Sequence, residues 1–274
     1  MGKLSTNRKP MLTQALPLLN PPLKWAGGKR WLIPRLSDFW QNYQDYTLVE
    51  PFVGGLAIAL GLQPQQALLN DINPHVINFY HWLQHGLVID FELHNDQTYY
   101  YRYRDQFNQL IRAGAEQTAE AAGLFYYLNR TGYNGLCRFN QRGLFNVPFG
   151  RYKRIRYCYD FSHYAETLRQ WRFQRGHFIE MQIPAQALIY ADPPYDVPFR
   201  AYSQQGFNWS EQVQLAEWLA QHPGPVLASN QATQRILDLY RNLGFSIEIL
   251  PAPRRIACNG DRQPALEMLA FKGA

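Results

Sequence analysis

The sequence of 274 residues contains few cysteines and no long apolar run. Its three cysteines, Cys137, Cys158 and Cys258, are far apart and odd in number, which argues against a disulfide framework, and none forms the CxxC pair of a zinc module. Because no stretch of about 18 apolar residues exists, the sequence predicts no membrane span. Residues 1–20 lack the apolar core of a signal peptide, and we interpret them as a flexible leader. We therefore expect a cytoplasmic protein with no metal and no membrane partner.

Acidic residues are scarce in one long stretch of the chain. From Arg130 to Arg175, Asp160 and Glu166 are the only acids, and they oppose ten Lys and Arg side chains. The whole chain has a net charge of +6, from 27 basic and 21 acidic residues. Aromatic side chains interleave with this basic block, a combination that suits a polyanion presenting flat bases. Charge alone leaves a second interpretation open, which is a basic surface without a nucleic-acid partner.

Apolar segments and helical patterns alternate at both ends of the chain. Helices are predicted after Arg30, Asn73 and Ser210, and strands at 47–52, 67–69, 187–191, 225–228, 245–249 and 266–271. Repeated strand–helix units predict an α/β fold with a mainly parallel sheet covered by helices. In the middle, helices at 97–112 and 118–130 lead into a basic, loop-rich segment with a β-hairpin around 142–143. We expect a discontinuous sheet domain at 21–84 and 177–274, interrupted by a mostly helical inserted domain at 85–176.

Two motifs in the N-terminal part are typical of nucleoside binding. Glu50 to Gly55 (EPFVGG) forms a strand-to-helix turn, in which glycines let a ligand approach the backbone and the helix N-terminus is electropositive. The next strand ends at Asp71, a position from which a carboxylate can accept hydrogen bonds from ribose hydroxyls. Upstream, the motif KWAGGK provides Trp25 to cover a flat ring and Lys29 to reach a carboxylate. Each motif taken alone also fits an ordinary surface turn.

The motif DPPY, from Asp192 to Tyr195, directly follows an apolar strand. Two prolines remove two backbone donors and stiffen the turn, which leaves the Asp192 carboxylate and the Pro193 carbonyl as fixed acceptors. Such acceptors suit an exocyclic amino group, and Tyr195 adds an aromatic face for the base. A base bound in this way must leave its duplex. The alternative is a proline-stiffened loop with a capping aspartate.

The basic middle segment contains the run NRTGYNGLCRFNQRGLFNVPFGRYK, which begins at Asn129 and ends at Lys153. A basic hairpin can enter the major groove, where arginine pairs with guanine, asparagine pairs with adenine and an apolar side chain contacts the thymine methyl. A solvated basic loop is the alternative interpretation.

Taken together, these motifs resemble the Dam-type (D12 class) DNA adenine-N6 methyltransferases over nearly the whole chain, in the order KWAGGK, EPFVGG, NDIN, recognition segment and DPPY. The resemblance implies a Rossmann-like methyltransferase sheet with an inserted target-recognition domain, and S-adenosylmethionine as cofactor. It implies methyl transfer to N6 of adenine in double-stranded DNA, expected at GATC, by base flipping and direct in-line transfer. No metal is required.

The resemblance also implies roles for individual residues, with Arg138 expected to contact guanine and Leu136 the thymine methyl. The catalytic residues are expected to be Asp192, Pro193, Pro194 and Tyr195. Cofactor contacts are expected from Trp25, Ala26, Lys29, Glu50, Phe52, Gly54, Asp71 and Asp192. DNA contacts are expected from Arg130, Tyr133, Asn134, Leu136, Arg138, Asn140, Arg151, Tyr152 and Lys153.

The glycine turn departs from the family pattern FVGxG, because Leu56 stands where the last glycine is usual. We expect the segment 196–209 to become ordered when DNA binds. Two alternatives remain on the same scaffold: an N4-cytosine or RNA adenine methyltransferase, and a DNA-binding module without catalytic activity. We expect a monomer associated with the nucleoid through DNA, and the sequence leaves open whether a cognate restriction endonuclease exists.

Overall fold

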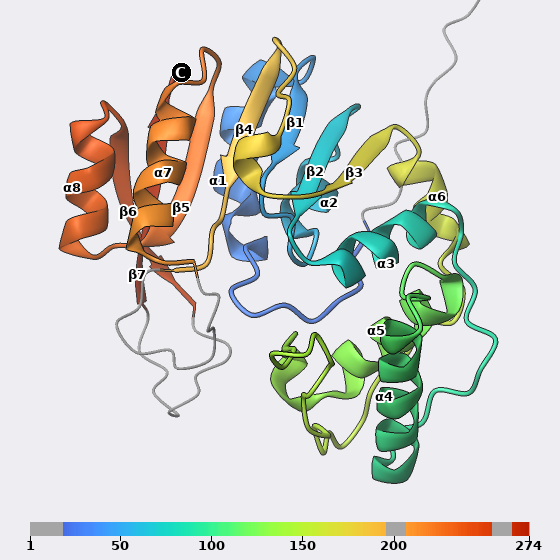
Figure 1. The fold of residues 1–274 in the computed structure, drawn as a ribbon. Coiled ribbons are helices and arrows are strands. Elements are labelled where there is room, and N and C mark those ends of the chain that lie inside the picture. Colours follow the sequence, from blue (N-terminus) through green and yellow to red (C-terminus); the bar gives the residue numbers. More distant parts are fainter. Residues whose placement is uncertain (1–18, 196–206, 254–264, 274) are drawn as a thin grey trace, which may run out of the picture.

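The computed structural model describes residues 19–195, 207–253 and 265–273, and a seven-stranded sheet forms its centre (Figure 1). The strand order is β3-β2-β1-β4-β5-β7-β6, in which β7 runs antiparallel to β5 and β6 and the other pairs are parallel. The strands are β1 (Thr47–Glu50), β2 (Ala67–Asp71), β3 (Trp171–Arg175), β4 (Ala187–Ala191), β5 (Val226–Gln231), β6 (Ser246–Ala252) and β7 (Ala265–Lys272). The expected α/β fold with a Rossmann-like methyltransferase sheet is confirmed.

Helices cover both faces of the sheet because its central strands are apolar on both sides. Successive side chains of a strand point to opposite faces, so Leu48 and Val49 of β1 belong to two different buried apolar clusters. The first cluster includes residues of α1 (Ile33–Trp40), α2 (Ala57–Leu62) and α3 (Pro74–Gln84). The second includes residues of α7 (Trp209–Ala220) and α8 (Gln234–Asn242). The strand order reverses between β1 and β4, where ligands bind in sheets of this kind.

The middle segment packs below the sheet in Figure 1 and is built around aromatic side chains. Its helices are α4 (Gln97–Arg112), α5 (Ala119–Thr131) and α6 (Ser162–Leu168). Phe79 of α3 stacks on Tyr126 of α5 with ring centroids 5.9 Å apart, so this region and the sheet share one buried cluster. The two helices predicted at 97–112 and 118–130 are confirmed, with Asp96 and Thr118 as their N-caps.

Three details differ from the sequence prediction. The strand β3 lies inside the expected inserted segment at 85–176, but it pairs in parallel with β2 at the sheet edge. The N-cap of helix α7 is Asn208, two residues before the predicted Ser210, and Asn208 forms a capping box with Glu211. The hairpin around 142–143 is a tight turn closed by a single bridge between Phe139 and Phe145, without regular strands.

Some expectations fall outside the described residues, among them Cys258, residues 1–18 of the leader and most of the segment 196–209. Asn20 is described, and its carbonyl accepts a hydrogen bond from Tyr164. Within the described ranges, no helix is long and apolar enough to cross a membrane. In that same part of the chain, no group of three or more His, Cys, Asp and Glu is arranged to hold a metal ion.

Candidate functional site

Three loops meet at the carboxyl edge of the sheet. They follow β1, β2 and β4, which are neighbouring parallel strands and therefore end on the same side. The turn after β1 and the end of β2 are joined directly, because the Gly54 N–H donates to Asp71 Oδ2 at 3.1 Å. The sequence motifs predicted for cofactor binding and for catalysis thus lie along one edge.

The glycine turn is covered by the indole of Trp25. Gly54 has a φ of +46°, and a Cβ there would lie 2.6 Å from Trp25 Nε1. A Cβ at Gly55 would lie 2.7 Å from Trp25 Cβ, so both positions require glycine for the close approach. Leu56, which stands where the family has glycine, takes a φ of +62° and is fully buried at the N-cap of α2. A left-handed leucine is strained by about 1–2 kcal/mol.

Asp71 is fixed by backbone donors on both carboxylate oxygens. Oδ2 accepts from Gly54, and Oδ1 accepts from the Asn73 N–H at 2.9 Å. Burial raises the pKa of Asp71, and the backbone hydrogen bonds oppose that shift. Tyr80 supports the same turn, since its hydroxyl donates to the Gly54 carbonyl. A carboxylate has about four lone-pair sites, so Asp71 keeps acceptor capacity for a ligand hydroxyl beside these backbone donors.

Glu50 ends β1 with a side chain that is only 2% exposed. Its Oε1 accepts from the Ala59 N–H at 2.9 Å, in the first turn of α2. Burial raises the pKa of Glu50 to about 8, the Ala59 hydrogen bond opposes the shift, and the negative charge of Asp192 adds to it. Glu50 therefore carries a proton at neutral pH and connects β1 to α2.

The Asp192 carboxylate is held through one of its two oxygens. Oδ1 lies 3.1 Å from Lys29 Nζ and accepts a hydrogen bond from Ser229 Oγ at 2.8 Å. The Tyr190 hydroxyl is 2.9 Å from the same Ser229 oxygen, which extends the chain into the sheet. Among the described residues, none donates to Asp192 Oδ2. Within the described part of the chain, Oδ2 is therefore left as an oriented acceptor for a ligand.

A second hydrogen-bond chain holds the other end of the DPPY motif. Gln212 of α7 donates from Nε2 to the Pro194 carbonyl at 2.8 Å. Asn230 of β5 donates to Gln212 Oε1 at 3.0 Å, which fixes the amide orientation. Both side chains are fully buried. The Pro193 carbonyl consequently lies between two anchored residues, Asp192 and Pro194.

Lys29 is a buried cation, with 3% of its side chain exposed. Besides Asp192, its Nζ lies 3.7 Å from Glu267 Oε2 on β7, 4.7 Å from the Tyr195 ring centroid and 2.7 Å from the Gly27 carbonyl. Burial raises the pKa of Glu267, and the Lys29 charge opposes this. Burial also raises the pKa of Tyr195, so its hydroxyl stays protonated. Lys29 thus lies between two carboxylates next to the DPPY motif.

The residues expected to contact DNA lie on the loops that follow α5, apart from Arg130, which lies in the last turn of that helix. Tyr133 is 49% exposed, and Asn134 and Arg151 have positive φ angles of +52° and +48°. Arg138 donates from Nε to Asn146 Oδ1 at 2.8 Å and from Nη2 to the Asn146 carbonyl at 3.1 Å. Leu136, between these residues, is half-buried, and the Lys153 side chain is exposed. The loops after α5 therefore present an aromatic side chain, an apolar side chain and several basic side chains.

The remaining DNA candidates stabilise this turn from within. Asn140 Oδ1 accepts from the Arg142 and Leu144 N–H groups at 2.9 and 3.1 Å. The Tyr152 hydroxyl donates to the Gly132 carbonyl at 3.0 Å, and Arg130 donates to the Arg156 carbonyl at 3.3 Å. A hollow of about 370 Å³ opens nearby, lined by Gln97, Tyr101, Tyr133, Pro148, Phe149, Gly150 and Arg151.

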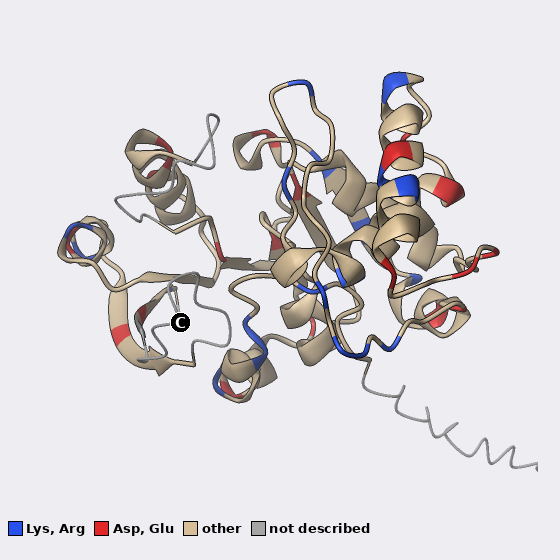
Figure 2. Ribbon diagram, turned by 90° about the horizontal axis from the view of Figure 1, so that it is seen from below, with Lys and Arg blue, Asp and Glu red and all other residues tan. Residues whose placement is uncertain are grey.

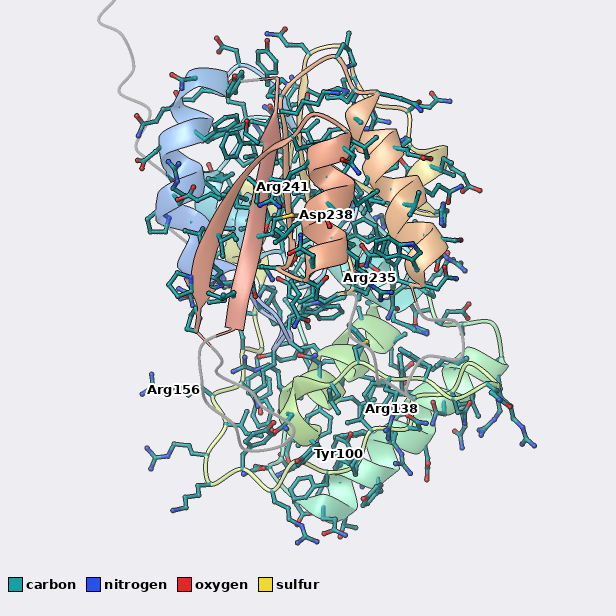
Figure 3. All side chains as sticks on the ribbon, turned by 90° about the vertical axis from the view of Figure 1, so that its left-hand side faces the viewer. Tyr100, Arg138, Arg156, Arg235, Asp238 and Arg241 are labelled. Atoms are coloured by element: carbon teal, nitrogen blue, oxygen red, sulfur yellow. The ribbon has the colours of Figure 1, made fainter. Side chains whose placement is uncertain are left out.

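The basic side chains of this region are spread along its loops. Figure 2 shows Lys and Arg spaced along the extended loops, while the helices beside them carry both signs of charge. In Figure 3, Arg138 and Arg156 lie in the same lower part of the molecule as Tyr100, apart from Arg235 and Arg241 on α8. Arg156 is exposed. The distribution gives one basic region next to the carboxyl edge of the sheet.

Several supporting residues of the site were missed by the sequence analysis. Ser229 and Asn230 lie near the end of β5, at the carboxyl edge of the sheet. Polar residues at the end of an apolar strand can be recognised in a sequence. Gln212 and Glu267 carry no such signal, because their places depend on how α7 and β7 pack on the sheet. Asn129, which is buried on α5, also accepts a hydrogen bond from the Lys24 N–H in the N-terminal loop before Trp25.

Comparison with known proteins shows the family of this chain. The sequence pattern of the D12 class N6 adenine-specific DNA methyltransferases matches residues 25–255. The chain belongs to this family. A DNA adenine methylase of Vibrio cholerae is 36% identical over 270 residues, which cover 91% of this chain and 94% of the relative. The DNA adenine methylase of Escherichia coli K12 is 34% identical with the same coverage, and the retron Ec67 DNA adenine methylase of Escherichia coli is 34% identical over 267 residues, covering 92% and 91%.

This D12 methyltransferase is therefore an adenine-specific DNA methyltransferase that depends on S-adenosylmethionine, and DNA is its substrate. Membership of the family favours adenine N6 in DNA over N4 of cytosine or adenine in RNA. It also favours an enzyme over an inactive DNA-binding module.

Proposed function

We propose that the enzyme methylates N6 of adenine within GATC in double-stranded DNA, after the adenine has been flipped out of the duplex. The observation that carries the proposal is the state of Asp192, whose Oδ1 is occupied by Lys29 and Ser229 while no described residue donates to Oδ2. Together with the Pro193 carbonyl, Oδ2 gives two acceptors on a turn that is held at both ends. An amino group has two N–H donors, so the two acceptors match it.

The chemistry follows from this pairing. The lone pair of an aromatic amino group is delocalised into the ring and is a weak nucleophile. Two acceptors that hold both N–H groups turn that lone pair toward the bound donor, and Tyr195 stacks on the base. Most of the rate enhancement then comes from positioning and from preorganised dipoles. Because N6 lies inside the duplex, the base must be extruded before it reaches the turn.

The residues along the carboxyl edge fit S-adenosylmethionine. When bound, this cofactor would supply an activated methyl group for direct in-line transfer, in which a bond from N6 to the methyl carbon replaces the methyl–sulfur bond, S-adenosylhomocysteine leaves and N6 releases one proton. Asp71 keeps acceptor capacity for ribose hydroxyls, and Phe52 offers an aromatic face beside Phe178, with ring centroids 5.7 Å apart. Trp25, Ala26 and Lys29 border the same edge from the N-terminal loop, with Trp25 against Gly54.

We assign DNA reading to the segment after α5. Arg138 is held by Asn146 in a fixed direction, which suits bidentate pairing with guanine, and Leu136 is the candidate for the thymine methyl. Tyr133, Asn134, Arg151, Tyr152 and Lys153, with Arg130 and Asn140 behind them, complete the proposed interface. In this proposal, residues 85–176 without β3 form the recognition domain and the rest of the described chain forms the catalytic one. We propose that it acts as a monomer on nucleoid DNA, with or without a cognate endonuclease.

The test is methyl transfer from labelled S-adenosylmethionine to three duplexes. One contains GATC, one contains GATC already methylated at N6 on both strands, and one contains a scrambled site. We expect label on the first duplex only, recovered as N6-methyladenine. Equal label on the scrambled duplex would contradict the GATC assignment, and label recovered as N4-methylcytosine would contradict the choice of base.

A further inference from the structure

One fully buried amide joins the N-terminal cofactor loop to the DNA-reading segment. Asn129, near the end of α5, has 0% of its side chain exposed. Its Oδ1 accepts from the Lys24 N–H at 2.8 Å, and its Nδ2 donates to the Lys24 carbonyl at 2.9 Å. The same Nδ2 lies 3.4 Å from the Gly135 carbonyl, to which it also donates. Lys24, Asn129 and Gly135 are called the Asn129 clamp below.

Each end of the clamp adjoins a different proposed binding surface. Lys24 directly precedes Trp25, whose indole covers the glycine turn after β1. Gly135 closes the turn Tyr133–Gly135, in which Asn134 has a φ of +52°. A movement of either surface that shifts the backbone of Lys24 or Gly135 must therefore break or strain the hydrogen bonds of Asn129.

The clamp has little room to adjust. A Cβ at Gly135 would lie 2.4 Å from Lys24 Cβ, so the two backbones are in close contact. The Lys24 side chain strengthens the junction, because Nζ donates to the Arg130 carbonyl at 2.6 Å and lies 3.4 Å from the Tyr152 ring centroid. Burial, and then the charge of Arg130, lowers the pKa of Lys24 to about 8.

A second contact between the two regions is weaker. Asn73, next to the ribose-side turn after β2, donates to Cys137 Sγ at 3.3 Å. Sulfur is a poor acceptor, whereas the clamp uses three carbonyl or amide groups in a fully buried setting. The clamp is the stronger of these two connections.

We propose that Asn129 is a positioning residue through which binding of S-adenosylmethionine and binding of DNA reinforce each other. The proposal rests on the proposed function, since it needs both ligands to bind where they are assigned above. When one ligand fixes the backbone of Lys24 or of Gly135, the Asn129 clamp also fixes the backbone of the other residue. The second ligand then binds a surface that is already ordered, so less conformational entropy is lost when it binds. Such coupling is reciprocal, so DNA must tighten cofactor binding by the same factor as cofactor tightens DNA binding.

A matched control lies in the same region. Asn108 of α4 is 7% exposed, donates from Nδ2 to the Phe145 carbonyl at 3.1 Å and accepts from the Phe145 N–H at 2.8 Å. Asn108 thus forms the same pair of hydrogen bonds with the backbone of Phe145 that Asn129 forms with the backbone of Lys24. Asn108 and Phe145, however, both belong to the middle segment. Asn129→Ala and Asn108→Ala therefore remove the same chemical groups and differ in whether they disconnect the cofactor loop.

The experiment measures binding of S-adenosylhomocysteine, which cannot react, with and without a GATC duplex. We expect DNA to tighten binding by at least about fivefold in the wild-type enzyme. Asn129→Ala should reduce this factor to about twofold or less, while Asn108→Ala should keep it even if both variants melt at a lower temperature. If Asn129→Ala fails to fold, Gly135→Ala decides by the same criterion, because its Cβ would lie 2.4 Å from Lys24 Cβ and would therefore displace Lys24 while keeping the Asn129 side chain.

Three results would overturn the inference: no coupling in the wild type, an unchanged factor in the Asn129 variant, or an equal loss in both asparagine variants. Turnover adds a further check, since loss of positioning should raise KM for both substrates more in Asn129→Ala than in Asn108→Ala. Failure of the proposed function is a separate result, in which the wild-type enzyme leaves the GATC duplex unmethylated.

Discussion

At the carboxyl edge of the sheet a buried lysine is paired with two carboxylates, whereas in the segment after α5 many charged side chains face solvent. Lys29 is 3% exposed between Asp192 and Glu267. Arg151 and Lys153 are exposed. A buried charge acts strongly on a nearby reacting group because little water screens it, while an exposed charge contributes by neutralising phosphate. Under the proposed function, the two regions therefore use charge for different purposes, catalysis in one and DNA binding in the other.

The two regions also differ in how their cores are packed. Between the sheet and α7, the buried side chains are mainly aliphatic, such as Val49, Ile189 and Leu215. The middle segment instead buries aromatic rings, among them Tyr100, Phe125 and Phe145. Long aromatic side chains fill the irregular space between two helices and loops, whereas β-branched and small aliphatic residues fit the flat face of a sheet.

The largest effect should come from Asp192→Asn. The amide of asparagine has one oxygen and one NH₂ group in place of two acceptor oxygens. In one orientation its NH₂ group faces the Lys29 cation, and in the other it faces the amino group of the base, so one acceptor is lost either way. We expect kcat to fall by about 100- to 1000-fold with DNA affinity retained. Asp238→Asn on α8 is the control, because Asp238 is exposed (Figure 3). Near-normal turnover of the Asp192 variant would contradict the proposed role.

The Lys29→Met variant should lose about 3 kcal/mol of folding free energy. It leaves the Asp192 and Glu267 carboxylates near each other without a cation, and breaking a buried ion pair costs about this much. Denaturant unfolding measures the loss. Adding Glu267→Gln should restore part of it, because one of the two carboxylates is then neutral. A double variant no more stable than Lys29→Met would show that the lost packing of the lysine dominates.

Glu50→Gln should change how stability depends on pH. The folded-state pKa of about 8 lies above the usual value of 4.5, so between these values the folded state holds a proton that the unfolded state has released. The contribution of Glu50 is therefore complete below about pH 4.5 and is lost as pH rises through 8, on the order of a few kcal/mol. Unfolding of the wild type and of Glu50→Gln at pH 5 to 8 should give diverging curves. The exposed Glu217→Gln should give a curve parallel to that of the wild type.

Arg138→Ala should relax sequence choice. Loss of a bidentate contact to guanine costs about 1–3 kcal/mol at the cognate base and little at other bases. The measurement is the ratio of kcat/KM for GATC to that for duplexes with one base pair changed. Arg156→Ala, an exposed change in the same region, should lower all values together. If Arg138→Ala did the same, Arg138 would contact only the backbone.

Much of the sheet could be predicted, because its central strands are apolar and end in polar motifs. The strand β3 was missed since, of Trp171–Arg175, only Trp171 is buried, and an edge strand with charged residues gives no apolar run. The N-cap of α7 was misplaced at Ser210 although Asn208 and Glu211 form a capping-box pattern that the sequence contains.

The place of the DPPY motif after a buried strand could be predicted, and most of the residues that contact it could not. Glu267 reaches Lys29 only because β7 inserts antiparallel beside β5, with Glu267 opposite Gln231. Gln212 of α7, which lies 18 positions after Pro194 in the sequence, donates to the Pro194 carbonyl. Such partners depend on register and on helix packing, which local sequence patterns do not encode. The departure at Leu56 has a structural counterpart, since its φ of +62° is the conformation for which glycine is usual.

The smallest effect should come from Lys153→Gln, which removes one exposed charge from the proposed DNA surface. Each phosphate contact contributes about 0.9 to the slope of log affinity against log salt, so the slope should fall by about that amount. The matched change Arg241→Gln removes an equal charge from α8, which Figure 3 shows above the lower part of the molecule that holds Arg138 and Arg156, and it should leave the slope unchanged. If both variants reduced the slope equally, net charge alone would explain DNA binding. If only Lys153→Gln reduced the salt slope, phosphate would bind in the region whose charges face solvent, and the comparison of the two regions would also separate where phosphate binds from where it does not.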